Sequence, residues 1–326
     1  MKTIFLIPIL FLSTILNTQI DYEKQNTLLL SAYRAKATKD YDTALKLYDE
    51  ALEIKQLNSI SEYLFAAICA AEIERNTSCE NWIKAAITDE NVTSKTILSF
   101  SKNEIYQESA QKVLANHEAL SNMFFSKKKN IAAYLEIQKL VIRDKLARKL
   151  NDYYSGISQK DQEEAFDGYL AAQKENDTIA LKKYKNILWP KISEEHDAYE
   201  DAIIRYTDSL NITKLINITK THGWQEEAHI LLWHQRGTYG DTNWVWNYFK
   251  PLIDTEIKAG TVAPFFWAMF EDFKSIIENG ETIYGYHPGK VNNGTVNAKR
   301  KSIGLPELTM AEIEERNNNP YGGRMY

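Results

Sequence analysis

The fold of this chain is decided by the stretch Tyr41-Asp42-Thr43-Ala44-Leu45-Lys46-Leu47-Tyr48-Asp49-Glu50-Ala51-Leu52. Its apolar and small residues recur at helical spacing, which predicts an amphipathic helix. Small residues also recur at positions 35 apart: Ala32 and Ala67, Ala35 and Ala70, Ala44 and Cys79, and Ala51 and Ala86. Small residues let two helices approach closely while larger ones fill the space between them. We therefore expect two antiparallel helix pairs, 26–38 with 41–54 and 60–75 with 78–88.

This pattern resembles the tetratricopeptide repeat, a helix pair with nearly the same period, over about residues 25–90. The usual glycine of the first helix is replaced by Ala32 and Ala67, and the proline that often closes a repeat is absent. The resemblance implies a module that binds another protein or a peptide. Two repeats leave both ends of a stack open, so we expect a capping helix at about 104–125. The repeat domain would then span 19–126, with Lys127-Lys128-Lys129-Asn130 as the boundary.

The first residues have the layout of a secretory signal peptide. Lys2 gives a positive start, and residues 4–15 are apolar apart from Ser13 and Thr14, which is too short to cross a bilayer. We expect a signal over 1–18 with cleavage near Thr18; the alternative is an uncleaved N-terminal anchor. No later segment is apolar enough to span a membrane. The sequence thus predicts a protein exported to the periplasm or the extracellular space, without stable membrane insertion once the signal is removed.

The composition favours an all-α fold. Only 13 glycines and 7 prolines occur in 326 residues, so few residues interrupt helices. The formal net charge of −5 argues against a nucleic-acid partner. The two cysteines, Cys69 and Cys79, are expected as buried free thiols, although export makes a disulfide feasible.

A second helical domain is expected over 127–310, followed by a disordered tail at 311–326. Turn-forming residues over 282–297 predict a small hairpin or an ordered loop. The expected helices cover 131–154, 159–186, 191–210, 210–218, 243–250, 251–258 and 264–278.

Residues 131–308 are similar to an uncharacterised bacterial domain family whose members are often exported and sometimes follow tetratricopeptide repeats. The resemblance rests on Gly223-Trp224, Leu231-Leu232, His234-Gln235, Tyr284-Gly285 and Arg300 before Gly304-Leu305. Family members usually have Gln-His in place of His234-Gln235, Arg in place of Phe273, and Thr-Gln in place of Tyr286-His287. An upstream Asp-Gln-x-x-Arg element is matched in part by Asp144 and Arg148. The resemblance supplies no known reaction.

Candidate functional residues concentrate where this resemblance is densest. Residues 222–237 hold three of the six histidines and two of the seven tryptophans. His234 is predicted to face the core, and Asp272 to lie on the shoulder of its helix, so these two are the candidate acid and base. Trp267 is expected to be exposed on that helix, opposite a buried face of Phe265, Met269 and Phe273. Candidate ligand-binding residues are His222, Trp224, Gln235, Arg236, Trp267, Tyr284 and His287.

Structural interpretations compete with each of these. A histidine on an apolar helix face is commonly a hydrogen-bonded core group. Asp144 and Arg148, four residues apart, are expected to form a surface ion pair. His229 and His234, five apart on one helix, cannot chelate one ion, and a metal would need His234 to be joined by His222, His287 or Asp272. No metal and no cofactor is expected.

The favoured hypothesis is an exported helical-repeat interaction module joined to a ligand-binding domain of unknown activity. The ligand would be a small molecule or glycan of the cell envelope, because tryptophan rings stack on sugar faces. One alternative is an envelope-associated hydrolase that uses His234 and Asp272. The other is a purely structural assembly protein, so the sequence leaves open whether the chain is an enzyme.

Overall fold

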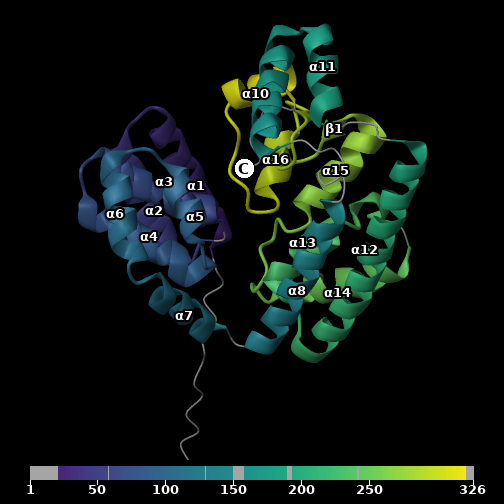
Figure 1. Ribbon diagram of the computed structural model, residues 1–326, viewed down its shortest axis with the longest axis horizontal. Coiled ribbons are helices and arrows are strands. Elements are labelled where there is room, and N and C mark those ends of the chain that lie inside the picture. Colours follow the sequence, from purple (N-terminus) through teal and green to yellow (C-terminus); the bar gives the residue numbers. More distant parts are fainter. Residues whose placement is uncertain are drawn as a thin grey trace, which may run out of the picture.

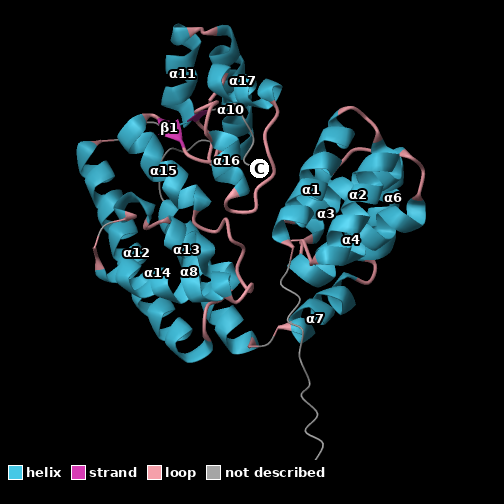
Figure 2. Cartoon of the chain, turned by 180° about the vertical axis from the view of Figure 1, so that it is seen from behind, coloured by secondary structure: helices cyan, strands magenta, loops and turns pink. Residues whose placement is uncertain are grey.

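The computed structural model describes residues 21–57, 59–128, 130–149, 158–188, 193–240 and 242–320. Within this part of the chain it contains 16 α-helices and two strands of two residues each, which confirms the all-α class (Figure 2). The helices gather in two groups, α1–α7 and α8–α17 (Figure 1). The predicted signal at 1–18 lies outside the described residues. Among the described helices, none combines the length and apolar character needed to cross a membrane.

The first four helices form two packed pairs. α1 packs on α2, α3 on α4, and α2 joins the pairs by packing on α3. Ala44 and Cys79 are both fully buried, as predicted. Cys69 and Cys79 are both buried free thiols. The helices are α1 (Tyr22–Ala37), α2 (Tyr41–Ile54), α3 (Ile60–Glu72) and α4 (Asn76–Glu90).

Two helices stand where a single capping helix is predicted over 104–125. α5 (Ser94–Phe100) is followed by α6 (Glu104–Leu114) and α7 (His117–Lys127), and both α6 and α7 pack on α4. The break falls at Asn116, whose φ and ψ of −117° and 22° lie outside the helical region. It redirects the chain, so that two short helices cover one face of α4.

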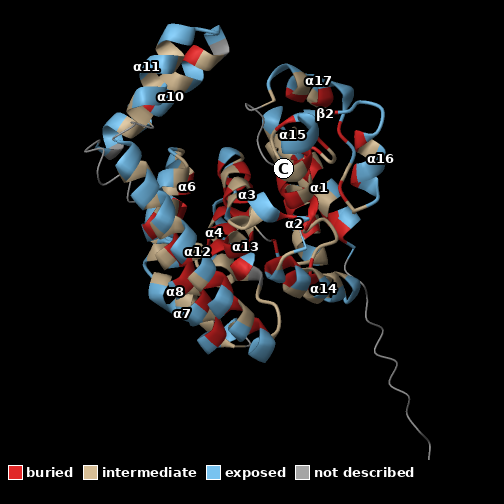
Figure 3. Cartoon of the chain, turned by 90° about the vertical axis from the view of Figure 1, so that its right-hand side faces the viewer, coloured by how far each residue is buried: buried red, intermediate tan, exposed pale blue. Residues whose placement is uncertain are grey.

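The C-terminal group is built around α8, α12, α13, α14 and α15, which contribute most of its core. The hairpin of α10 and α11 is largely exposed beside them (Figure 3). The helices are α8 (Ile131–Arg148), α10 (Gln159–Glu175), α11 (Thr178–Leu188), α12 (Glu194–His222), α13 (His229–Trp233), α14 (Trp244–Lys258), α15 (Ala268–Asn279), α16 (Val296–Lys301) and α17 (Met310–Asn318), with short 3-10 turns at Glu226–Ala228 and Arg236–Thr238.

Two helix breaks differ from the sequence prediction. Asn176, in the left-handed conformation with φ of 55°, ends α10 inside the predicted helix 159–186. Conversely, α14 continues through Pro251, where the sequence predicts a boundary between two helices. The apolar residues of α14 pack against the core, and this packing keeps the helix continuous although Pro251 has no backbone N–H to donate.

The helix predicted over 264–278 begins at Ala268 and presents a different face to the core. Phe270 and Asp272 are buried, whereas the predicted buried face is only half-buried; it comprises Phe265, Met269 and Phe273. The expectation that Trp267 is exposed is wrong, because 9% of it is accessible and its Nε1 donates to Asp254 at 2.8 Å.

The C-terminal end holds two further corrections. β1 (Glu281–Thr282) and β2 (Lys290–Val291) pair in parallel. Of the two alternatives predicted for 282–297, the hairpin is therefore wrong, and the loop remains. The tail predicted to be disordered from residue 311 contains most of α17. That helix is stabilised by a capping box between Thr309 and Glu312, and it buries Ile313.

The two helix groups meet at two places. α7 ends at Lys127 and α8 begins at Ile131, close to the predicted domain boundary. At the other end of the interface, one face of α1 packs on the C-terminal residues (Figure 1). Its contacts are Tyr22 Oη to the Gly260 carbonyl at 3.2 Å, Asn26 Nδ2 to the Gly304 carbonyl at 2.9 Å, and Arg34 to the Glu312 carboxylate through Nε and Nη2.

Candidate functional site

Three elements of the C-terminal group bring their polar side chains together. Asp144 lies on α8, Asp208 on α12, and His234 caps the C-terminus of α13. α8 packs on both α12 and α13, so these positions face one another. Asp144 follows Ile137 and Leu140 along the buried face of α8, and for this reason its carboxylate points inward.

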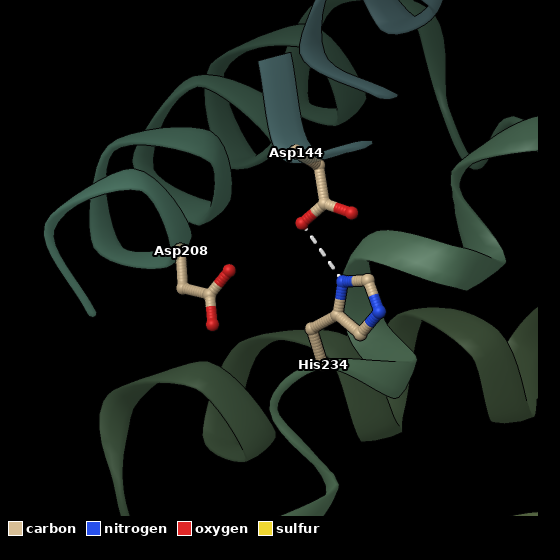
Figure 4. A group of neighbouring side chains, drawn as sticks. All are labelled: Asp144, Asp208 and His234. Carbon is tan, nitrogen blue, oxygen red and sulfur yellow. Dashed lines mark hydrogen bonds and ion pairs between the residues drawn. The ribbon is translucent and has the colours of Figure 1, made fainter. Parts of the chain in front are cut away.

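Arg148 joins these groups into one network, hereafter the polar centre: Asp144, Arg148, Asp208 and His234. Arg148 donates from Nη1 to Asp144 Oδ1 at 2.6 Å, and from Nη2 to both Asp208 oxygens at 2.9 Å. His234 Nδ1 lies 2.8 Å from the same Asp144 oxygen (Figure 4). The Asp144 side chain is 2% exposed and that of Asp208 16%, so Asp144 is buried and Asp208 is partly buried.

The imidazole of His234 has one bonded and one open nitrogen. A carboxylate partner holds a proton on Nδ1, which leaves Nε2 as a proton acceptor. Nε2 points away from both carboxylates (Figure 4) and has no hydrogen-bond partner among the described residues. The His234 side chain is 13% exposed. The arrangement orients an imidazole and leaves its second nitrogen available.

Aromatic rings and a second arginine border the polar centre. The Arg236 guanidinium lies over the rings of Trp233 and Phe273, 4.6 and 4.9 Å from their centroids. The His287 ring lies 5.8 Å from that of Trp233. Burial lowers the pKa of Arg236, and the nearby charge of Arg148 lowers it further.

The polar centre also contains a set of potential metal ligands. Asp144, Asp208 and His234 each offer one ligand atom, and these three atoms lie within 4.8 Å of one another. Burial raises the pKa of the Asp208 carboxyl, although the hydrogen bond from Arg148 opposes this. Carboxylate oxygen and imidazole nitrogen are donors that divalent transition metals accept.

The structure gives Asp272 a different role from the one expected. Its fully buried carboxylate accepts four backbone N–H bonds, from Ile283 and Tyr284 on one oxygen and from Tyr286 and His287 on the other, at 2.6 to 2.9 Å. Burial raises the pKa of this carboxyl, and the four donors pull it back towards its ordinary value. Asp272 therefore fixes the loop 283–287 and shares no hydrogen-bond partner with His234 among the described residues.

The remaining predicted site residues are divided between three places. Arg236 and His287 both contact the Trp233 ring. Gln235 lies between His234 and Arg236 in the chain and donates its backbone N–H to the Leu232 carbonyl. Tyr284 belongs to the Asp272 loop and donates its hydroxyl to Glu271. The others lie apart: exposed His222 contacts Asn130, Trp224 packs in the core against Phe249 and Phe266, and Trp267 is buried in the same core.

Sequence reasoning missed Asp208 and misinterpreted Asp144 and Arg148. The interpretation as a surface ion pair is wrong, because Asp144 is buried and Arg148 also binds Asp208. The available signal was the register of Asp144 with Ile137 and Leu140 on one helix face.

None of the protein-family models, curated proteins or solved structures compared with the chain matches it at a significant level.

Proposed function

We propose that the chain is an exported binding protein: the helices of residues 22–127 bind a protein or peptide, and the C-terminal domain binds a ligand at the polar centre. The observation that carries this proposal is the buried carboxylate of Asp144 and the partly buried carboxylate of Asp208 beside the imidazole of His234. Removing charges from water costs several kcal/mol each, and apolar side chains of similar volume often stabilise a domain better. Charged side chains in the interior are therefore not explained by stability alone. We take them as support for a ligand-binding role of the polar centre.

A half-buried aromatic surface supports the interaction module. The Lys36 ammonium of α1 lies 4.2 Å from the Phe65 ring centroid of α3, and Phe65 contacts the Phe100 ring at the end of α5. Accessible ring faces beside a positive charge suit a peptide with apolar and acidic side chains. A peptide-display selection against the wild-type chain should enrich such peptides, and Lys36→Glu should lose them. Enrichment of basic peptides would contradict this surface assignment.

Export is proposed from residues 1–18, which lie outside the described residues. N-terminal sequencing of the chain recovered from the periplasm or the medium should start near residue 19. A chain retained in the cytoplasm with Met1 intact would contradict export.

Ligand binding at the polar centre is tested by thermal unfolding with a panel of defined probes. The panel comprises inorganic phosphate, acetate, N-acetylglucosamine, Mg²⁺, Mn²⁺ and Zn²⁺. A ligand at about 100 times its Kd stabilises the native state by about 2.7 kcal/mol, which is a measurable shift in Tm. We expect at least one probe to shift the wild type and the control His222→Gln, but not His234→Gln. If no probe shifts the Tm of the wild type, the polar centre is a structural network. That result would favour the hypothesis of a purely structural assembly protein.

A hydrolase is the second candidate, favoured by the 2.8 Å contact between His234 and Asp144. Asp144 here orients the imidazole of His234, and it replaces Asp272, which the sequence analysis paired with His234 as acid and base. A general base needs an accessible nitrogen, and diethyl pyrocarbonate acylates accessible unprotonated imidazoles. In the native protein His234 should be acylated, with exposed His222 as the internal reference. Acylation of His222 while His234 stays unmodified would contradict this candidate.

A further inference from the structure

We propose that the ligand of the polar centre is a divalent transition-metal ion held by Asp144, Asp208 and His234, and that Arg148 is the counter-ion which the metal displaces. This inference rests on the binding role proposed above and names the ligand. It assigns Arg148 to the metal-free state, in which a guanidinium compensates the two carboxylates.

The donor geometry is already close to that of a coordination shell. Ligand atoms about 2.1 Å from one ion lie about 3 Å apart when they are neighbours in the shell. The 2.8 Å separation of His234 Nδ1 and Asp144 Oδ1 is close to this spacing. In the metal-bound state the imidazole proton lies on Nε2 instead of Nδ1, so that Nδ1 coordinates the ion. The three ligand atoms lie within 4.8 Å of one another, so Asp208 needs only a small side-chain movement to complete the set. They come from α8, α12 and the end of α13, which the core holds in place (Figure 4).

The size of the site favours an ion over an organic ligand. A hollow of about 370 Å³ lies elsewhere on the described surface, between α1 and the segment around Gly260. At the polar centre, the space between the carboxylates is occupied by the end of the Arg148 side chain. A single ion fits where that guanidinium lies, whereas a sugar or a peptide does not.

The charge balance allows the exchange. Among the groups that hydrogen-bond within the polar centre, the two carboxylates exceed the single Arg148 guanidinium by one negative charge, whereas a divalent ion balances them in full. Arg236 lies outside this network, over the rings of Trp233 and Phe273. Arg148 lies in the last turn of α8 with its side chain 27% exposed, so it can turn to solvent without moving the helix. One nitrogen and two carboxylate donors suit Zn²⁺, Co²⁺ or Mn²⁺ better than Ca²⁺ or Mg²⁺, which prefer oxygen alone.

The test is metal titration of the full mature chain, prepared without a histidine tag and treated with chelator. Co²⁺ binding is followed by visible absorption and Zn²⁺ binding by calorimetry. We expect one ion per chain, at least about tenfold weaker binding by His234→Gln and Asp208→Asn, and unchanged binding by the control His222→Gln. Arg148→Met should bind more tightly, because it removes the competing cation.

Near-UV circular dichroism establishes that each variant keeps its tertiary packing. If Asp208→Asn fails to fold, His234→Gln and Arg148→Met still decide the matter. The proposal is overturned if the wild type binds no ion, if His234→Gln binds as tightly as the wild type, or if folded Arg148→Met binds more weakly. If no metal ion binds but phosphate or acetate shifts the Tm of the wild type and not that of His234→Gln, the metal proposal fails and the proposed ligand-binding role of the polar centre stands.

Discussion

Replacing Asp272 by Asn should destabilise the C-terminal domain strongly, although the two side chains have nearly the same shape. The amide oxygen can still accept from Ile283 and Tyr284, but the NH₂ group then faces the N–H donors of Tyr286 and His287. Hydrogen bonds to a charged group contribute about 1.5–3 kcal/mol each, so losing two costs about 3–6 kcal/mol. Domains are stable by about 5–15 kcal/mol, which makes this a large fraction.

Urea unfolding followed by tryptophan fluorescence measures this loss. Five of the seven tryptophans lie at 224, 233, 244, 246 and 267, so the signal reports mainly on the C-terminal domain. Asp254→Asn is the matched control, because Asp254 accepts a side-chain hydrogen bond from Trp267 and an amide oxygen can replace that acceptor. We expect the control to change the free energy of unfolding by less than about 1 kcal/mol.

The reasoning is refuted if Asp272→Asn unfolds within about 1 kcal/mol of the wild type. If that variant keeps its stability but loses a probe response that the wild type shows, Asp272 belongs to the functional site. That result would support the hypothesis from the sequence that His234 and Asp272 act together as acid and base.

Three further experiments test the packing of charged groups. Burial raises the pKa of Glu62 to about 7, so the folded state holds this proton more tightly than the unfolded state does, and wild-type stability should fall as pH rises from about 4.5 through 7. Glu62→Gln should therefore gain about 2 kcal/mol at pH 8 and little at pH 4, with exposed Glu72→Gln as the control; a gain equal at both pH values would contradict this. Asp144→Asn should cost about 3–5 kcal/mol in urea unfolding, because it leaves buried cationic partners unbalanced; a cost below about 1 kcal/mol would contradict the buried network. A double-mutant cycle of Arg34→Ala and Glu312→Gln should give a coupling of about 0.5–1 kcal/mol, and a coupling of zero would mean that the contact between α1 and α17 adds no stability.

The helix pairs could be predicted because their signal is local and repeated. Ala44 and Cys79 are both fully buried, and the repetition of small residues along the chain distinguishes this pattern from chance. The orientation of α15 could not be predicted, because aromatic residues surround its start. Phe265, Phe266, Trp267 and Phe270 supply apolar side chains in every direction, so no single periodic face stands out.

The polar centre could be predicted only in part, because its contacts are non-local. Asp144 and Arg148 form an i,i+4 pair that looks alike in sequence whether it lies on the surface or in the core. The residues that decide its role, His234 and Asp208, are 90 and 60 positions from their partners in the chain. The helix register of Asp144 indicates burial, but not which side chains it meets.

The buried carboxylates of Asp272 and Asp144 differ in the groups that hydrogen-bond to them. This difference indicates a structural role for Asp272 and a binding role for Asp144. Asp272 is held by backbone N–H groups, which it cannot exchange unless the loop 283–287 unfolds. Asp144 is held by the side chains of Arg148 and His234, which can change partners by rotation about their own bonds. A site that exchanges a counter-ion for a ligand requires the second kind of partner. Asp272→Asn should therefore act on stability and leave probe binding intact in the folded fraction, whereas Asp208→Asn should act on binding.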